Sequence, residues 1–211
     1  DDRKAYARPI EADYYTDAQI KVDLKVLDTF KRERMAKADK VAGELSVTWL
    51  PTMYKKIRFG THENVGWGEI HLPETTMHTT GYWIDFPENA GDEAELAEKA
   101  LGESLHALAH TLRQVAPVQV LCDLTDIRAH AMVRSPFSDR PAVYLYEGYP
   151  GGVGISDKLF THHNRLLDAA ISLLAECSCK EGCPSCVGTA LEVGRHGKRG
   201  ALKLAYLARG E

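Results

Sequence analysis

The sequence of 211 residues has no long apolar run: nothing in it approaches the about 20 consecutive apolar residues that a membrane helix needs. It opens on DDRKAYARPI, without an initiating Met and without the apolar stretch of a secretory signal. We therefore expect a cytoplasmic segment of a longer polypeptide, with no membrane partner. An excess of one charge is missing too, because 26 Lys and Arg face 30 Asp and Glu, for a formal net charge of −4. That balance excludes a general affinity of the surface for DNA, so any such binding must use a local patch.

The sequence also lacks the nucleotide-binding loop G-x-x-x-x-G-K-[ST], so we expect this segment to be no ATPase and no enzyme by itself. A Gly-rich loop, GYPGGVGIS, does enter a predicted helix at Ser156. Backbone amides at such a place can hold an anion. We favour the simpler interpretation of a tight turn that packs the helix closely on a strand, because glycine serves turns by default.

Apolar and polar residues alternate from about residue 20 to residue 86, with Gly and Pro between the runs, which predicts strands of an antiparallel or strongly bent sheet. The alternating apolar positions are Val22, Leu24, Val26, Leu45, Val47, Trp49, Ile57, Phe59, Ile70, Leu72, Tyr82, Ile84 and Phe86. The composition, with 27% charged and 44% hydrophobic residues, is that of an ordinary globular protein.

The period changes to that of a helix after residue 86. Asp92 and Glu95 form a capping pair, and the helix that they would start has an apolar face of Leu101, Leu105, Leu108, Leu112 and Val115. PVQVLCDL and PAVYLYEGYPGGVG predict strands, the second one central, whereas ISDKLFTHHNRLLDAAISLLAEC predicts a long helix and KRGALKLAYLAR a short last one. The fold class is therefore α+β, with a strand-rich part over residues 1–90 and a helix and strand part over residues 91–211, which we expect to form one compact unit.

Four of the five cysteines fall within the segment CSCKEGCPSC, at Cys177, Cys179, Cys183 and Cys186. Disulfides between such close neighbours would close strained small loops, whereas four thiolates around one point suit a zinc ion. Gly182 allows a sharp turn between the second and third thiol, and Pro184 stiffens the last loop. An iron–sulfur cluster also takes four cysteines and stays an alternative. Because four thiolates leave no open coordination position, we expect one structural metal ion per chain rather than a catalytic one.

Other potential metal ligands have simpler interpretations. His106 and His110 have the spacing of the H-E-x-x-H metalloprotease helix, but Ala107 stands where the general base should be, so we expect a packed or partly exposed pair. Cys122 follows an apolar run, which is typical of a buried core thiol. The remaining candidates are expected in turns or on a solvated helix face: His71, His78, His162 and His163.

Basic residues gather in two clusters. The first, Lys55, Lys56 and Arg58 in YKKIRFG, is interleaved with aromatic residues as on surfaces that bind single-stranded nucleic acid, although a solvated strand face explains it about as well. The second adjoins the cysteines and consists of Arg195, Lys198, Arg199 and Lys203. Cations at the start of a helix are mildly unfavourable, which favours an anionic partner for this second cluster. We favour it as the DNA contact, since a metal-bound loop would hold it rigidly.

The segment YEGYPGGVGISDKLF, followed by a helix and then CSCKEGCPSCVG, resembles the C-terminal zinc-binding domain of MrfA-type DEAD/DEAH-box DNA helicases. ARPIEADYYT, ENVGWGEIHLPETTMHTTGYW, SLHALAH and APVQVLCDLTDI are similar too, so the resemblance spans nearly the whole chain. It implies that the four cysteines hold a structural zinc and that two RecA-like motor domains precede this region in a parent chain. Arg128 departs from the pattern, because similar sequences often have Gly there, so the loop after Ile127 is expected to differ.

The resemblance thus implies an accessory domain of an ATP-dependent DNA helicase in DNA repair, which docks on the RecA-like motor and helps to enclose single-stranded DNA. The alternative is a non-catalytic assembly module of a phage-defence or repair complex that lacks its own motor. A P-loop and a D-E-x-[DH] box upstream of Asp1 in the parent gene would favour the helicase.

Overall fold

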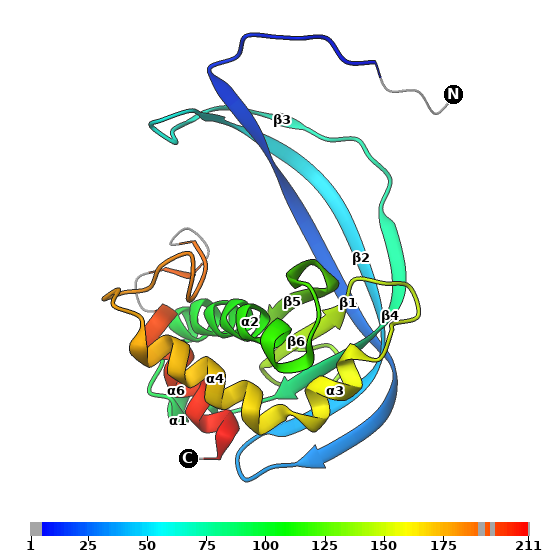
Figure 1. Ribbon diagram of the computed structural model, residues 1–211, viewed down its shortest axis with the longest axis vertical. Helices are drawn as coiled ribbons and strands as arrows, with labels where there is room; N and C mark the ends of the chain where they lie inside the picture. Colours follow the sequence, from blue (N-terminus) through cyan, green and yellow to red (C-terminus); the bar gives the residue numbers. More distant parts are fainter. Residues whose placement is uncertain (1–5, 190–192, 195–196, 211) are drawn as a thin grey trace. The chain divides into compact units, whose positions relative to one another are not determined.

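The computed structural model describes residues 6–189, 193–194 and 197–210, and Figure 1 labels its elements. Strands come first: β1 (Tyr14–Arg34), β2 (Asp39–Arg58), β3 (Asn64–Glu69) and β4 (Thr75–Asp85). Helices and further strands follow: α1 (Ala90–Glu93), α2 (Glu98–Val120), the 3-10 turn η1 (Leu124–Asp126), β5 (Ile127–Met132), β6 (Ala142–Glu147), α3 (Ile155–Thr161), α4 (His163–Glu176) and α6 (Gly197–Arg209). The predicted α+β class with a strand-rich N-terminal part is confirmed.

The chain divides into two compact units. The first consists of Asp1–Asp23 with Thr48–Thr76, and the second of Leu24–Val47 with Met77–Glu211. Strands β1 and β2 are each about 20 residues long, and each contributes residues to both units. The division at residue 90 marks where strands give way to helices, and it stays a prediction for folding units.

The described strands form one sheet in the order β1-β2-β4-β6-β5, and β3 pairs with β2. In the second unit β6 lies antiparallel between β4 and β5, with Tyr144 opposite Trp83 on one side and Leu145 opposite Ala129 on the other. All residues of β6 are buried, as expected for a central strand that is apolar on both faces.

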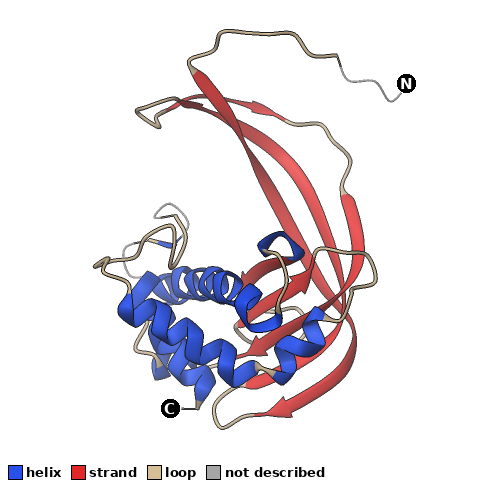
Figure 2. Cartoon of the chain, viewed as in Figure 1, coloured by secondary structure: helices blue, strands red, loops and turns tan. Residues whose placement is uncertain are grey.

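The core of the second unit lies between its strands and its helices. Helix α2 packs against α4 and α6 and also covers β5 and β6, and Figure 2 shows these helices gathered together in blue. The predicted apolar face of α2 is buried at Leu101, Leu105, Leu108 and Leu112, whereas Val115 is only half-buried. In the described part of the chain, no helix combines the length and the apolar character that a membrane crossing requires.

The strand predicted for PVQVLCDL is wrong, because α2 continues through Pro117 to Val120. Ala116 and Val120 extend the buried face of the helix at the four-residue spacing of Leu108 and Leu112, so packing overrides the β propensity of the segment. The strand comes later, as β5, in a segment that the sequence suggested to be a loop.

The expected capping pair is also absent from its predicted position. Asp92 lies inside the short helix α1, and Glu95 has a left-handed backbone with a φ of 53° in the break between α1 and α2. Helix α2 starts at Glu98, after Ala97, whose side chain cannot cap. The single long helix predicted after the Gly-rich loop is likewise interrupted at His162, between α3 and α4.

Candidate metal centre

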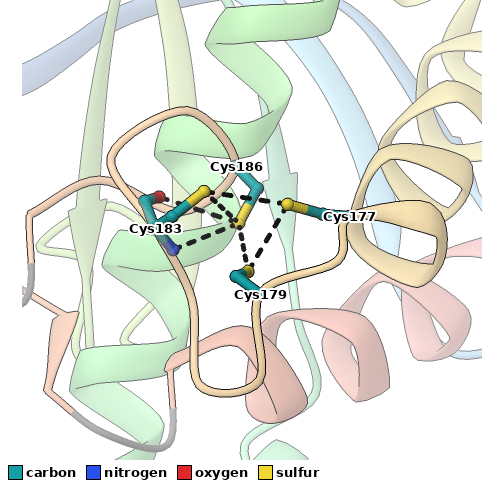
Figure 3. Close-up of side chains that lie close together, drawn as sticks. All are labelled: Cys177, Cys179, Cys183 and Cys186. Atoms are coloured by element: carbon teal, nitrogen blue, oxygen red, sulfur yellow. Dashed lines mark hydrogen bonds between the residues drawn. The ribbon is translucent and has the colours of Figure 1, made fainter.

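Figure 3 shows the four thiols of the cysteine cluster converging on one point from the loop that follows α4. All four Sγ atoms lie within 4.8 Å of one another. Neighbouring sulfurs are separated by 3.4 Å between Cys177 and Cys179, 3.7 Å between Cys177 and Cys183, and 3.5 Å from Cys186 to both Cys179 and Cys183. A tetrahedral zinc with Zn–S bonds of about 2.3 Å keeps its sulfurs about 3.8 Å apart. The cluster therefore fits a single ion, whereas an iron–sulfur cluster distributes its cysteines over different irons.

The backbone of the loop turns where the sequence suggested. Gly182 has a φ of 121°, and a Cβ atom there would lie 2.5 Å from Cγ2 of Val187. Any other residue at this position would be strained and would collide with that side chain. Pro184 lies in a tight turn in which the N–H groups of Cys186 and Val187 donate to the carbonyl of Cys183 at 3.1 and 3.0 Å. This turn brings the last two thiols of the cluster together.

The electrostatics of the loop favour thiolates at the exposed end of the cluster. The backbone N–H groups of Cys186 and Ser185 hydrogen-bond the sulfur of Cys183 and lower its pKa to about 6. Burial acts in the opposite direction on Cys186 and raises the pKa of its thiol to about 12. A divalent cation among the sulfurs would make all four cysteines thiolates despite these opposite pKa shifts, because coordination deprotonates a thiol outright. The donor set thus fits a metal ion better than four protonated thiols.

Two side chains from distant helices hold the backbone of the cluster. The ammonium of Lys198, in the first turn of α6, donates to the carbonyls of Cys177 and Cys179 at 2.7 and 2.6 Å. The hydroxyl of Thr111, in the middle of α2, lies 2.8 Å from the carbonyl of Cys186. Neither contact was anticipated from the sequence, in which Lys198 stood out only as part of a basic cluster.

The first basic cluster lies on β2, in the first unit. Lys55 is paired with Trp67 of the neighbouring strand β3. The ammonium of Lys56 lies over the ring of Tyr14, 5.0 Å from its centroid. The guanidinium of Arg58 lies 3.6 Å from the carboxylate of Asp13 and 3.7 Å from that of Glu63. Aromatic side chains do accompany the cations, as the sequence suggested. Arg58, however, is already shared between two carboxylates.

The second basic cluster is partly committed to the protein itself. Lys198 is bound to the two cysteine carbonyls, and Lys203 forms an ion pair with Glu95 at 2.6 Å. Arg199 is exposed, and Arg195 lies outside the described residues. Of the three described cations of this cluster, Lys198 and Lys203 are thus already engaged by groups of the protein itself.

The Gly-rich loop is a tight turn, and the protein supplies its own anion there. The carboxylate of Glu147, at the end of β6, accepts hydrogen bonds from the N–H groups of Val153 and Ser156 at 2.5 and 2.8 Å and from the hydroxyl of Thr80 at 2.7 Å. Burial raises the pKa of Glu147, but these donors outweigh burial and lower it overall. Because this carboxylate occupies the N-terminus of α3, the loop offers no place there for an external anion.

The histidines that the structure describes do not form a second metal site. Among the described residues, the cysteine cluster is the one group of His, Cys, Asp and Glu side chains with ligand atoms close enough to share a metal ion. His106 is exposed and His110 lies 3.2 Å from the side-chain nitrogen of Gln114. The expectation of a solvated position is wrong for His163, which is 1% exposed and whose Nδ1 lies 2.6 Å from the hydroxyl of Tyr82. Burial lowers the pKa of His163 to about 4, so the ring is neutral at pH 7.

Comparison with known proteins gives this site a context. Residues 108–187, which include all four clustered cysteines, match the family model described as the MrfA Zn-binding domain. The uncharacterized ATP-dependent helicase YprA of Bacillus subtilis is 37% identical over 192 residues, which are 91% of this chain and 25% of the relative. The ATP-dependent helicase HRQ1 of Saccharomyces cerevisiae is 24% identical over 129 residues, 56% of this chain and 12% of the relative.

Among solved structures, too, the chain is similar to a helicase. The chain is similar to the crystal structure of the DUF1998 helicase MrfA bound to DNA, with a TM-score of 0.72 and 35% identity over 94% of this chain and 26% of that one. For the same helicase bound to DNA and AMPPNP the TM-score is 0.59, with 31% identity over 93% of this chain and 23% of that one. The chain thus spans about a quarter of the length of these helicases. The resemblance inferred from the Gly-rich loop and the cysteines is confirmed, and with it a zinc ion as the metal of this domain.

Proposed function

We propose that this chain, which carries an MrfA Zn-binding domain over residues 108–187, is the zinc-containing accessory region of an ATP-dependent DNA helicase that acts in DNA repair. The observation that carries the proposal is the four-thiol cluster, because it lies at the end of the matched segment and has the geometry of a closed zinc site. The similarity to a helicase bound to DNA extends over 94% of the chain, well beyond the cysteines, and supports the same assignment.

The zinc ion has a structural role in this proposal, with Cys177, Cys179, Cys183 and Cys186 as its ligands. Four thiolates saturate the ion and leave no position for a catalytic water. The ion would tie the loop after α4 to the core, since Cys186 and Val187 are fully buried there. Zinc affinity would then contribute directly to the folding free energy of this region.

The motor activity belongs to other parts of the parent chain in this proposal. The sequence contains no nucleotide-binding loop, and the ATP-dependent helicase YprA, which it matches over 91% of this chain, is about four times as long. RecA-like motor domains of the same parent chain are therefore the partners on which this region docks, and the single strand runs between the region and the motor. A parent gene without a P-loop and a D-E-x-[DH] box would instead favour the assembly module.

For direct contact with the strand, the surface of the first unit has better support than the second basic cluster. Trp67 is 64% exposed and lies directly opposite Lys55, and Phe59 is 58% exposed and contacts the ring of Tyr15 at 5.5 Å. Exposed rings beside cations allow bases to stack while the cations neutralise phosphates. Lys198, by contrast, already donates hydrogen bonds to two carbonyls.

Fluorescence anisotropy of the parent protein on single-stranded DNA at three salt concentrations tests this surface. Replacing Lys55, Lys56 and Arg58 by Ala should weaken binding and lower the log–log salt slope by about 0.7 for each lost phosphate contact. Trp67→Ala should weaken binding by about 1–3 kcal/mol and leave the slope unchanged, because stacking releases no counterions.

The matched control replaces three exposed cations of the second unit, Lys99, Arg134 and Lys158, by Ala. It removes the same charge and should bind as the parent does. If the salt curves of both triple variants and of the parent coincide, the first unit does not contact the strand, while the zinc-region assignment stands.

A further inference from the structure

Lys198 occupies a position that a DNA-contacting lysine would not need. It lies in the first turn of α6, where the helix dipole disfavours a cation, and its side chain is half-buried. Its ammonium donates to the carbonyls of Cys177 and Cys179 at 2.7 and 2.6 Å. Two of the three hydrogen-bond donors of the ammonium are thus directed to the first C-x-C segment of the cluster.

The position of Lys198 is fixed by the packing of α6 against α2. A Cβ atom on Gly200 would lie 1.8 Å from Oγ of Ser104, so the two helices approach more closely than any larger residue would allow. Thr111 lies two turns further along α2 and reaches the carbonyl of Cys186. The two helices that pack at Gly200 therefore also hold the two ends of the cysteine loop.

The ammonium of Lys198 also affects the charge balance of the metal site. Four thiolates around a zinc dication carry two excess negative charges, in a loop whose last cysteine is fully buried. A cation bound to the backbone carbonyls of two of these ligands offsets part of this excess from beside the cluster. The anionic zinc–thiolate cluster would then be the partner of the cation at the start of α6, in place of an external anion.

The geometry points to Lys198 as the positioning and charge-balancing residue of the zinc centre, and not as a contact for nucleic acid. This inference rests on the proposed ligation of zinc by the four cysteines. It assigns two effects to one side chain: hydrogen bonds that hold the carbonyls of Cys177 and Cys179, and a positive charge that lowers the cost of the fourth thiolate. Removal of the side chain should accelerate zinc release without removing a ligand.

The test is zinc affinity of the 211-residue chain, measured by competition with a chromophoric chelator. Lys198→Met should lower the affinity about 10- to 100-fold, which is the usual effect of losing a partner of a metal ligand. Lys198→Arg keeps the charge and should recover most of the loss, whereas Lys198→Gln keeps a donor without the charge and should fall between. Arg199→Met removes the same charge from the next, exposed position and should bind zinc as the parent does.

Cobalt-substituted protein provides a readout that general destabilisation would not move. The visible absorption of cobalt should keep its tetrahedral four-thiolate form in Lys198→Met but saturate at higher metal concentration than in the parent. If Lys198→Met and Arg199→Met both hold zinc as tightly as the parent, the role of Lys198 is refuted while the ligand assignment survives. A parent chain that binds neither zinc nor cobalt would refute the ligand assignment itself.

Discussion

Replacement of one cysteine ligand should destabilise the whole helical core and not only the loop. In Cys183→Ser a hydroxyl replaces the sulfur that lies 3.7 Å from Sγ of Cys177 and 3.5 Å from Sγ of Cys186. A serine hydroxyl does not ionise at neutral pH, so the ion keeps three thiolates. Structural zinc contributes about 10–16 kcal/mol in small zinc-dependent folds. If three thiolates retain about two thirds of that, the loss is about 3–5 kcal/mol.

The loss should spread because the loop is part of the core. Cys186 and Val187 belong to the same buried cluster as Leu108 of α2, Leu174 of α4 and Leu204 of α6. For a chain of this length, a loss of 1 kcal/mol in the free energy of unfolding lowers the Tm by roughly 2–4 °C. The Tm of Cys183→Ser should therefore lie roughly 6–20 °C below that of the parent.

Thermal unfolding monitored by circular dichroism, with zinc content measured on the same samples, is the assay for this loss. The matched control is Cys122→Ser, which changes the fifth cysteine at the end of α2, outside the cluster, and should keep both zinc and most of the stability. A Cys183→Ser protein that has lost its zinc but melts with the parent would refute the structural role and make the loop an appendage.

Two further predictions concern buried groups of the second unit. Burial lowers the pKa of His163 from 6.5 to about 4, so its neutral ring contributes fully to stability above pH 6.5. The free energy of unfolding should fall by about 3 kcal/mol as the pH decreases to 4. Urea unfolding should show that His163→Asn removes this fall, whereas the control His162→Asn keeps it. Glu147→Gln should lower the free energy of unfolding at pH 7 by about 1.5–3 kcal/mol, because the amide cannot accept all the hydrogen bonds of the carboxylate, whereas the exposed Glu88→Gln should have little effect. Since the pKa of Glu147 is lowered in the fold, its contribution is present above about pH 4.5 and is lost as the pH falls further, so equal acid sensitivity of Glu147→Gln and the parent would contradict it.

The sequence was most informative where local spacing decides the structure. The cysteine cluster could be predicted because its four ligands lie in one short loop with Gly182 at the turn, and the α+β class could be predicted because the apolar period changes after residue 86. It was misleading where tertiary packing decides. PVQVLCDL has the composition of a strand, yet Ala116 and Val120 continue the buried face of α2 and keep it helical.

The partners of the site could not be predicted because they come from distant parts of the chain. Lys198 and Thr111 reach the cluster only once α6 has packed against α2, and a sequence shows neither contact. Glu147 left a weak signal, since an acidic residue at the end of a buried strand and just before a Gly-rich loop is a candidate for filling that loop.

Metal content is the most direct test of the central claim that this region is built around a closed four-thiolate zinc site. Elemental analysis of the chain, purified without added metal, should find one zinc ion per chain, and Cys183→Ser prepared in parallel should contain less. Iron accompanied by visible charge-transfer absorption would replace zinc with an iron site and contradict the assignment of the metal. A folded chain that contains no metal would contradict the account altogether.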